Sequence, residues 1–408
     1  MRLFFKEISK MTLAGWMIWS CLFAAYEFSK GQIPLTIHLY EEEAKEVLSG
    51  TQKKIDPKDL YLDFAGNIEV SKTADGNYQG ICHLLGVIPV KTMEISVVPK
   101  ETLIPGGIPV GIYVQTEGVF VIGTGNVETD HGEVESPAKN IIKTGDYIVS
   151  IQGVKINRKE ELIQELKNFK EEEVILGIRR NEESLAVAVT PVMKEDGAKI
   201  GVWVRDDTQG VGTLTYLTGD GKFGALGHGI SDADSELLME VSGGQLYDCE
   251  IFDIIKGNPG NPGKVAGKIV YNQNNLYGEI TGNFSGGIYG NANQHLRKSM
   301  KYGAMPMALM QEVKEGEAII LSSVDGELKE YRVEIEKIHK GEKDINRGME
   351  LVVTDERLLE ITGGIVQGMS GSPVIQNGRI VGAVTHVLVN DPTRGYGIFI
   401  ENMLEAAK

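Results

Sequence analysis

The feature that most constrains the fold of this chain is the way its apolar residues are grouped. Its Val and Ile runs are mostly short and end at Gly, Asn, Asp or Pro, and the 408 residues include 50 Gly. Short apolar runs separated by residues that favour tight turns predict strands. A chain of this length can form two or three domains, each with its own core. We therefore expect a mainly β protein of several domains.

Composition excludes some classes of function. The net charge of -16 argues against nucleic acid as a partner, because contacts to phosphates need a basic face. Outside the N-terminal apolar segment only Cys82 and Cys249 could pair, so at most one disulfide is available there. No Cys/His cluster has the spacing of a zinc site, and there is no His-Glu-x-x-His motif. We expect no metal and no cofactor.

Residues 1–30 are predicted to be a cytoplasmic tail followed by a membrane-targeting segment. Three basic residues, Arg2, Lys6 and Lys10, precede the apolar stretch Met11 to Tyr26. Its length is marginal for a bilayer, which takes about 20 residues to cross. The basic flank would keep the N-terminus in the cytoplasm and send the rest across. We favour an uncleaved signal anchor over a signal peptide cut near Ala24; in both cases the body of the protein works outside the cytoplasm.

Residues 31–98 read as a β-rich region without assigned chemistry, and residues 99–192 have a more regular order of elements. A Gly-rich turn and strand run from Pro105 to Val114, a hairpin from Tyr147 to Ile156 and an amphipathic helix from Arg158 to Phe169, before two further strands. This order resembles a PDZ domain, in which a peptide adds as a strand beside the helix and backbone amides hold its terminal carboxylate.

The PDZ resemblance places the carboxylate-binding loop at Val110, Gly111, Ile112 and Tyr113. The alternative is a scaffolding domain with a vestigial groove.

The stretch Gly-Met-Ser-Gly-Ser-Pro at residues 368–373 carries the candidate nucleophile. Ser370 lies between glycines, which tolerate the tight turn that would expose its hydroxyl. If the amides of Gly368 and Ser370 point the same way, they form an oxyanion hole. An Asn-Gly turn between two apolar strands follows at once and predicts a hairpin. The segment resembles the nucleophile region of chymotrypsin-like serine peptidases, so a double β-barrel is expected for residues 193–408.

His228, in Gly-His-Gly-Ile-Ser-Asp at residues 227–232, is the candidate general base. Its rival His386 lies on the strand that leaves the nucleophile hairpin, a position that better suits a specificity pocket. A carboxylate would fix the imidazole tautomer and stabilise its charged form. Asp355, Asp248 and Asp253 are the candidates, and spacing does not decide among them.

The targeting segment, the PDZ-like region and the two Gly-rich motifs, in this order, resemble the stage IV sporulation protein B peptidases of spore-forming Firmicutes. The resemblance implies a serine peptidase with its triad on His228, Asp355 and Ser370. It implies export across the forespore membrane into the space facing the mother cell. There such a peptidase cleaves itself and a regulator of a membrane-embedded metallopeptidase, which releases processing of a late sigma factor, and its PDZ domain recognises a peptide. The alternative function is a catalytically inactive PDZ-bearing protein that regulates a membrane partner by docking.

Overall fold

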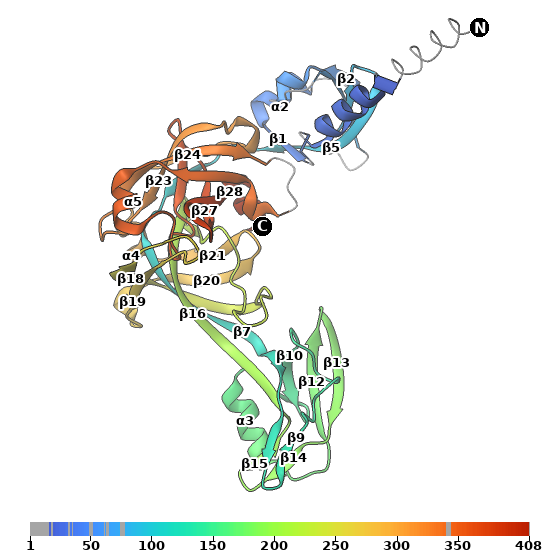
Figure 1. The fold of residues 1–408 in the computed structure, drawn as a ribbon, viewed down its shortest axis with the longest axis vertical. Helices are drawn as coiled ribbons and strands as arrows, with labels where there is room; N and C mark the ends of the chain where they lie inside the picture. The colour runs from blue at the N-terminus through green and yellow to red at the C-terminus, as the bar shows by residue number, and fades with distance from the viewer. Residues whose placement is uncertain are drawn as a thin grey trace, which may run out of the picture.

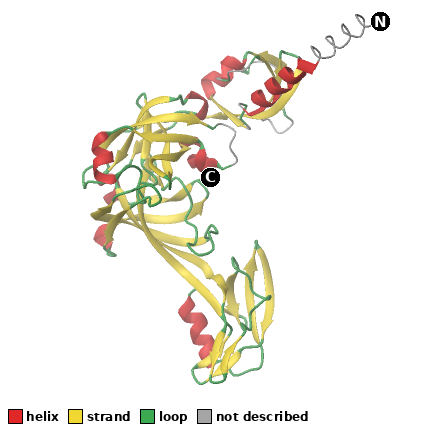
Figure 2. Cartoon of the chain, viewed as in Figure 1, coloured by secondary structure: helices red, strands yellow, loops and turns green. Residues whose placement is uncertain are grey.

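The computed structural model describes residues 16–407 except 18, 32, 35, 49–51, 61, 63–64, 74–77 and 340–343. Figure 2 shows that strands make up most of the described chain, which confirms the expected mainly β class. Residues 11–15 and 18 of the predicted membrane segment lie outside the described part. Within that part, no helix combines the length and the apolar character needed to cross a membrane.

The N-terminal unit is a five-stranded sheet with α2 and with the helical residues 19–31, whose Tyr26 packs against the core of the unit. Its strand order is β1-β5-β4-β3-β2, and β1 runs parallel to β5 while the other neighbours are antiparallel. The bounds are β1 (Thr36–Tyr40), α2 (Glu41–Val47), β2 (Gln52–Ile55), β3 (Gly66–Lys72), β4 (Tyr78–Leu84) and β5 (Ile88–Val98). His38 of β1 is buried beside Glu401 and Glu405 of the C-terminal helix, so this sheet rests on the end of the chain.

Six strands form a first closed ring through their hydrogen-bonded pairings. The order is β7-β18-β20-β21-β17-β16, and β16 pairs back onto β7. Its members are β7 (Pro109–Thr124), β16 (Val202–Thr218), β17 (Lys222–Ala225), β18 (Val241–Ile255), β20 (Leu276–Phe284) and β21 (Gly287–Ala292). The edge strands β6 (Thr102–Pro105), β19 (Lys264–Ile269) and β22 (Met305–Pro306) and the helix α4 (Gln294–Ser299) flank the ring.

The two longest strands of this ring leave it together and build a second unit. Residues 119–124 of β7 pair with the start of β16 and with β10, far below the ring in Figure 1. This unit contains β8 (Val127–Thr129), β9 (Gly132–Val134), β10 (Tyr147–Ile151), β11 (Val154–Lys155), α3 (Lys159–Asn168), β12 (Val174–Arg180), β13 (Glu183–Val189), β14 (Val192–Lys194) and β15 (Gly197–Lys199). A strand from the region 99–192 therefore shares a ring with strands from the region 193–408.

A second barrel follows, closed in the order β23-β24-β25-β28-β27-β26. It consists of β23 (Gly316–Ser322), β24 (Lys329–Ile338), β25 (Met349–Val353), α5 (Glu356–Thr362), β26 (Pro373–Gln376), β27 (Arg379–Leu388) and β28 (Asp391–Phe399), before α6 (Ile400–Ala406). Buried apolar side chains such as Ile320, Val333, Leu351 and Val374 fill it. Ser370, the candidate nucleophile, lies just before β26, at the rim of this barrel.

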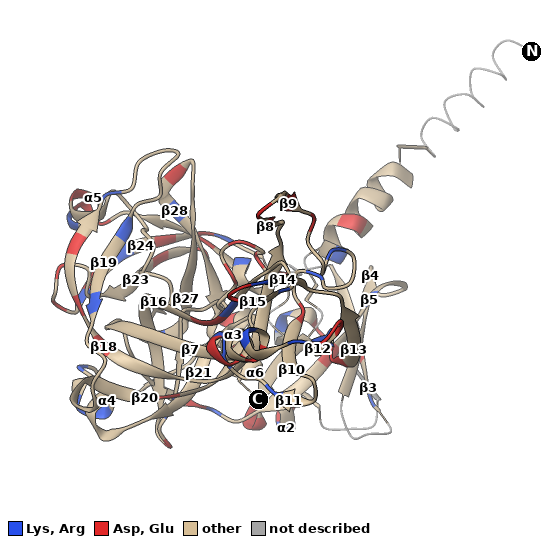
Figure 3. Cartoon of the chain, turned by 90° about the horizontal axis from the view of Figure 1, so that it is seen from below, with Lys and Arg blue, Asp and Glu red and all other residues tan. Residues whose placement is uncertain are grey.

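Charge is distributed over the whole molecule. Figure 3 shows acidic and basic residues interspersed along the strands and helices, α3 among them. The excess of acidic residues gives the net charge of -16.

Candidate active site

A cavity of about 480 Å³ lies between the two barrels and brings the candidate catalytic residues together. From the first barrel it is lined by part of β16 and by the turn after β17, which carries His228. From the second barrel it is lined by the turn that carries Ser370 and by residues of β27, including Thr385 and His386. Ser370 and His228, predicted from separate motifs, therefore face one cavity.

The turn that presents Ser370 depends on glycine. Gly371 has a φ of 96°, and a Cβ there would lie 2.1 Å from the backbone oxygen of Thr213, so a larger residue is excluded. The Ser370 hydroxyl donates a hydrogen bond of 2.6 Å to the Thr385 carbonyl oxygen. In the described residues no hydrogen bond joins this hydroxyl to His228. A hydroxyl rotates readily, and catalytic hydrogen bonds are often unformed without substrate.

The two amides predicted to bind the oxyanion have no internal acceptor in the described part of the chain. Their neighbours do: Met369 donates to the Val366 oxygen at 3.1 Å, and Gly371 donates to the Val384 oxygen at 2.8 Å. The turn is therefore held by the amides of Met369 and Gly371. The amides of Gly368 and Ser370 remain able to donate to a ligand in the cavity.

His228 sits in a glycine frame that is packed tightly. A Cβ on Gly229 would lie 2.6 Å from the Phe284 oxygen, so this glycine allows two backbone segments to approach. Its own carbonyl oxygen lies 2.9 Å from Nδ1 of His228. Burial lowers the pKa of His228. If the neutral imidazole donates its Nδ1–H to this carbonyl oxygen, Nε2 carries no hydrogen and can act as a base.

His386 stacks against His228, with ring centroids 4.9 Å apart and planes tilted by 33°. Desolvation and the neighbouring His228 lower the pKa of His386 to about 4. Asp344, which acts on it in the opposite direction, begins a short 3-10 turn beside β28. Both imidazoles are therefore neutral at neutral pH.

The three candidate carboxylates all lie outside the lining of this cavity. Asp355 is 2% exposed and is the N-cap of α5, and its oxygens accept hydrogen bonds from Arg357 and from the Arg332 amide. Hydrogen bonding from Arg357 holds the pKa of Asp355 well below its usual range. Asp248 and Asp253 lie on β18, where Asp253 accepts from the next backbone amide. The structure brings Ser370 and His228 together and gives Asp355 other partners.

The cavity carries no charged side chain among its described lining residues. Apart from the two histidines, Ser370 and a few other polar groups, it is lined by glycine, proline and aliphatic residues such as Ile365, Val366, Val387 and Val389. Residues that sequence motifs did not indicate contribute to it, among them Thr385 and the segment 208–211. Contacts between distant segments place them there: Thr213 of β16 donates to the Ser370 oxygen, and the Thr385 oxygen accepts from the Ser370 hydroxyl.

The four residues predicted as a carboxylate-binding loop have a different place in the structure. Val110, Gly111, Ile112 and Tyr113 belong to the half of β7 that lies in the first ring, where they pair with β16 and β18. Val110 and Ile112 are buried, and Ile112 lines the cavity that holds Ser370. They do not line the groove beside α3, because this part of the chain is an internal barrel strand with both edges paired.

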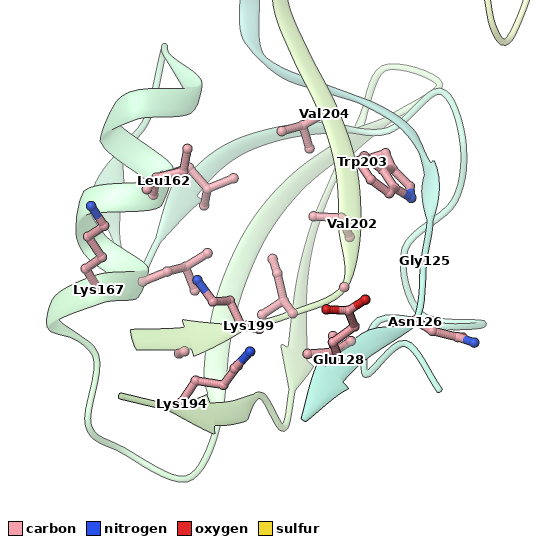
Figure 4. Close-up of a pocket in the computed structure, with 16 residues that line it drawn as sticks. Gly125, Asn126, Glu128, Leu162, Lys167, Lys194, Lys199, Val202, Trp203 and Val204 are labelled. Carbon is pink, nitrogen blue, oxygen red and sulfur yellow. The ribbon is translucent and has the colours of Figure 1, made fainter. Parts of the chain in front are cut away.

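The groove beside α3 is formed by other residues. It has a volume of about 390 Å³, with Leu162, Ile163 and Leu166 of α3 on one side and Val202 and Val204 of β16 on the other. Figure 4 shows the helix and this strand facing each other, with Lys194 and Lys199 near one end. In the described part of the chain, β7 is the only strand that pairs with residues 202–205, so the other edge of β16 is open beside the helix.

Comparison with known proteins identifies the family to which the chain belongs. Residues 196–404, more than half of the chain, match the model of the SpoIVB peptidase S55 family. The chain is thus a serine peptidase. This chain is a member of the SpoIVB peptidase family, S55.

Two solved structures are similar to parts of the chain. One is the PDZ domain of an SdrC-like protein, Lmo2051, from Listeria monocytogenes, with 20% identity over 22% of this chain and 90% of that chain, and a TM-score of 0.18. The other is an inactive serine-to-alanine mutant of Rv3671c from M. tuberculosis, with 12% identity over 48% of this chain and 79% of that chain, and a TM-score of 0.26. A search of curated proteins found no match.

Proposed function

We propose that this serine peptidase is a sporulation signalling endopeptidase in which Ser370 is the nucleophile and His228 is the general base. The observation that carries the catalytic part is the placement of both residues on one cavity between two barrels, beside two amides that have no acceptor among the described residues. The resemblance alone supports Asp355 as the third member, since its described contacts are with Arg357 and Arg332.

The reaction follows the two-step acyl-enzyme route. The Ser370 hydroxyl breaks its hydrogen bond to the Thr385 carbonyl, and its Oγ attacks the carbonyl carbon of the peptide while His228 takes the hydroxyl proton. The amides of Gly368 and Ser370 bind the oxyanion. His228 then gives the proton to the leaving amine. In the second step His228 takes a proton from a water molecule, which attacks the acyl-enzyme ester, and the cleavage releases the acid and restores the Ser370 hydroxyl. Every step is an acyl or proton transfer between groups on the chain, the peptide and water.

A fluorophosphonate probe tests this assignment. We expect labelling of the wild type, loss of labelling and of peptide hydrolysis in Ser370→Ala and in His228→Ala, and full labelling of Ser285→Ala. Ser285 is a matched control because it is an exposed serine in another Gly-containing turn. Unimpaired labelling of Ser370→Ala would show that the nucleophile is elsewhere, and an unlabelled wild type would favour an inactive docking protein.

The cellular role rests on the family. For a SpoIVB peptidase we propose export across the forespore membrane, self-cleavage, and cleavage of a regulator of a membrane-embedded metallopeptidase. The basic residues before the apolar stretch Met11 to Tyr26 support membrane targeting. N-terminal sequencing of the mature protein, made as wild type and as Ser370→Ala, should show a new N-terminus only in the active protein. The same new terminus in both would refute self-cleavage.

For the groove beside α3 we propose a peptide ligand that adds as a strand to the open edge of β16. An unpaired strand edge next to an apolar helix face is the setting in which extended peptides bind. We expect Ile163→Glu to weaken binding of a fluorescent apolar hexapeptide with a free carboxylate by at least about tenfold, since burying an unpaired charge is costly. Ile175→Glu, at an exposed apolar position outside the groove, is the control. Equal binding by both variants would refute the site.

A further inference from the structure

Strand β16 passes directly behind the nucleophile turn and touches it twice through one residue. The amide of Thr213 donates to the Ser370 oxygen at 3.0 Å, and its Oγ1 donates to the Gly368 oxygen at 2.7 Å. Thr213 is buried, with 4% of its surface exposed. We propose that Thr213 is a positioning residue that holds the oxyanion hole in shape, an inference that rests on the proposed function of Ser370.

The geometry of a peptide chain explains why this contact matters. Each carbonyl lies in one rigid plane with the amide that follows it. The plane formed by the Gly368 carbonyl and the Met369 amide lies between the two amides that would bind the oxyanion. Thr213 Oγ1 holds this plane at its oxygen, and the Val366 carbonyl holds it at its nitrogen. The relative direction of the Gly368 and Ser370 amides is therefore set through a plane that Thr213 fixes.

Gly368 makes the contact more important. It has a φ of 101°, and glycine moves between backbone conformations more freely than any other residue. The neighbouring planes are held by backbone donors: Val265 donates to the Gln367 oxygen and Ser372 donates to the Met369 oxygen. Of the contacts that hold carbonyls 367–370, the one to Gly368 comes from a side chain. It alone can be removed by a substitution that leaves the backbone donors in place.

Thr213→Val removes the hydroxyl and keeps the shape of the side chain, whereas Thr213→Ser keeps the hydroxyl. The strand also supplies a matched control, because Thr215 is fully buried on β16 and its hydroxyl has no hydrogen-bond partner among the described residues. Thr215→Val is expected to leave activity unchanged. The measurements are the rate of fluorophosphonate labelling, the kcat and KM for a fluorogenic peptide with an aliphatic residue before the scissile bond, and the melting temperature.

We expect Thr213→Val to lower kcat and the labelling rate by about 10- to 100-fold with KM within about twofold, since a single oxyanion donor is worth about 100- to 1000-fold. Thr213→Ser should recover most of the loss. A folded Thr213→Val protein with wild-type kcat would overturn the inference. So would a Thr213→Ser variant that is as slow as Thr213→Val, or a Thr213→Val protein that does not fold. An unlabelled wild type would instead refute the proposed function.

Discussion

Removal of the Asp355 carboxylate should destabilise the second barrel by an amount that its contacts allow us to calculate. Asp355→Ala removes the N-cap of α5, worth about 1 kcal/mol. It also leaves the amide of Arg332 without its acceptor, at about 1–3 kcal/mol. The ion pair with Arg357 adds less than about 1 kcal/mol, because that side chain is 62% exposed. The expected loss is about 2–5 kcal/mol in the free energy of unfolding.

Asp355→Asn is the matched variant. Asparagine keeps an acceptor oxygen and is as good an N-cap as aspartate. It loses mainly the ion pair with Arg357, so it should lower the free energy of unfolding by about 1 kcal/mol. Thermal unfolding in the Ser370→Ala background, which excludes self-cleavage, measures both. For a domain of about 200 residues each kcal/mol shifts the melting temperature by about 2–4 °C, so we expect about 4–20 °C for alanine and about 2–4 °C for asparagine. An alanine variant that melts with its parent, or equal losses in the two variants, would refute the capping role.

The pH dependence of this stability has a definite sign. Hydrogen bonds from Arg357 lower the pKa of Asp355 in the folded state below its usual 3.8. A carboxylate with a lowered pKa contributes stability above the unfolded-state value, and that contribution is lost as the pH falls toward the folded-state value. The stability difference between parent and Asp355→Asn should therefore be largest at neutral pH and shrink below pH 3.8. A difference that grows on acidification would contradict the assignment.

Activity of the same variant decides the third catalytic role. If Asp355 orients His228, as the resemblance implies, Asp355→Asn with Ser370 intact should lower kcat by more than about 100-fold while remaining folded. An asparagine variant with wild-type kcat would restrict Asp355 to the helix cap that the structure describes.

Three further predictions concern the cavity. Burial lowers the pKa of His228 below its usual 6.5, so the acid limb of kcat/KM should have its midpoint below pH 6.5, and a midpoint above that value would contradict the role of burial. Peptides with Asp, Glu, Lys or Arg before the scissile bond should be cleaved at least about tenfold less efficiently than those with Val or Leu, because an unpaired charge would be buried; a preference for a charged residue would count against this cavity as the substrate site. Asp232, buried four residues after His228, pairs with Arg205 of β16, so Asp232→Asn should lower kcat by about tenfold at similar KM, and unchanged kcat would show that the pair does not hold the loop.

The hairpin that follows Ser370 was predictable because its signals are local. Asn377 and Gly378 both have positive φ, 52° and 72°, and they join β26 to β27 as the Asn-Gly sequence indicates. The helix expected from Arg158 to Phe169 is confirmed as α3 for the same reason, since its apolar residues repeat at helical spacing. Neighbouring residues determine both elements.

The place of Val110 to Tyr113 could not be predicted from the sequence, because distant pairings determine it. The sequence indicates a Gly-rich turn and strand from Pro105 to Val114, and the structure continues this strand as β7 to Thr124. Four residues, 116–119, bulge opposite Asp206 where β7 leaves the ring. Gly111 pairs with Val211, which is 100 positions away in the chain. A Gly-rich strand that resembles a carboxylate-binding loop thus becomes a barrel strand, and residues that follow α3 line the groove.

Strand β16 accounts for the way the functional parts of this protein are assembled. Its first residues, Val202 to Val204, line the groove beside α3. Arg205 then pairs with Asp232 in the loop that follows His228, and Asp206 accepts hydrogen bonds from Lys159 at the start of α3. Residues 208–211 line the cavity, and Thr213 holds the nucleophile turn. The backbone geometry of one strand therefore fixes the relative positions of the groove, the proposed base and the proposed oxyanion hole. In such an arrangement the groove unit is a structural part of the peptidase domain, since the strand that forms its open edge also lines the cavity that contains Ser370.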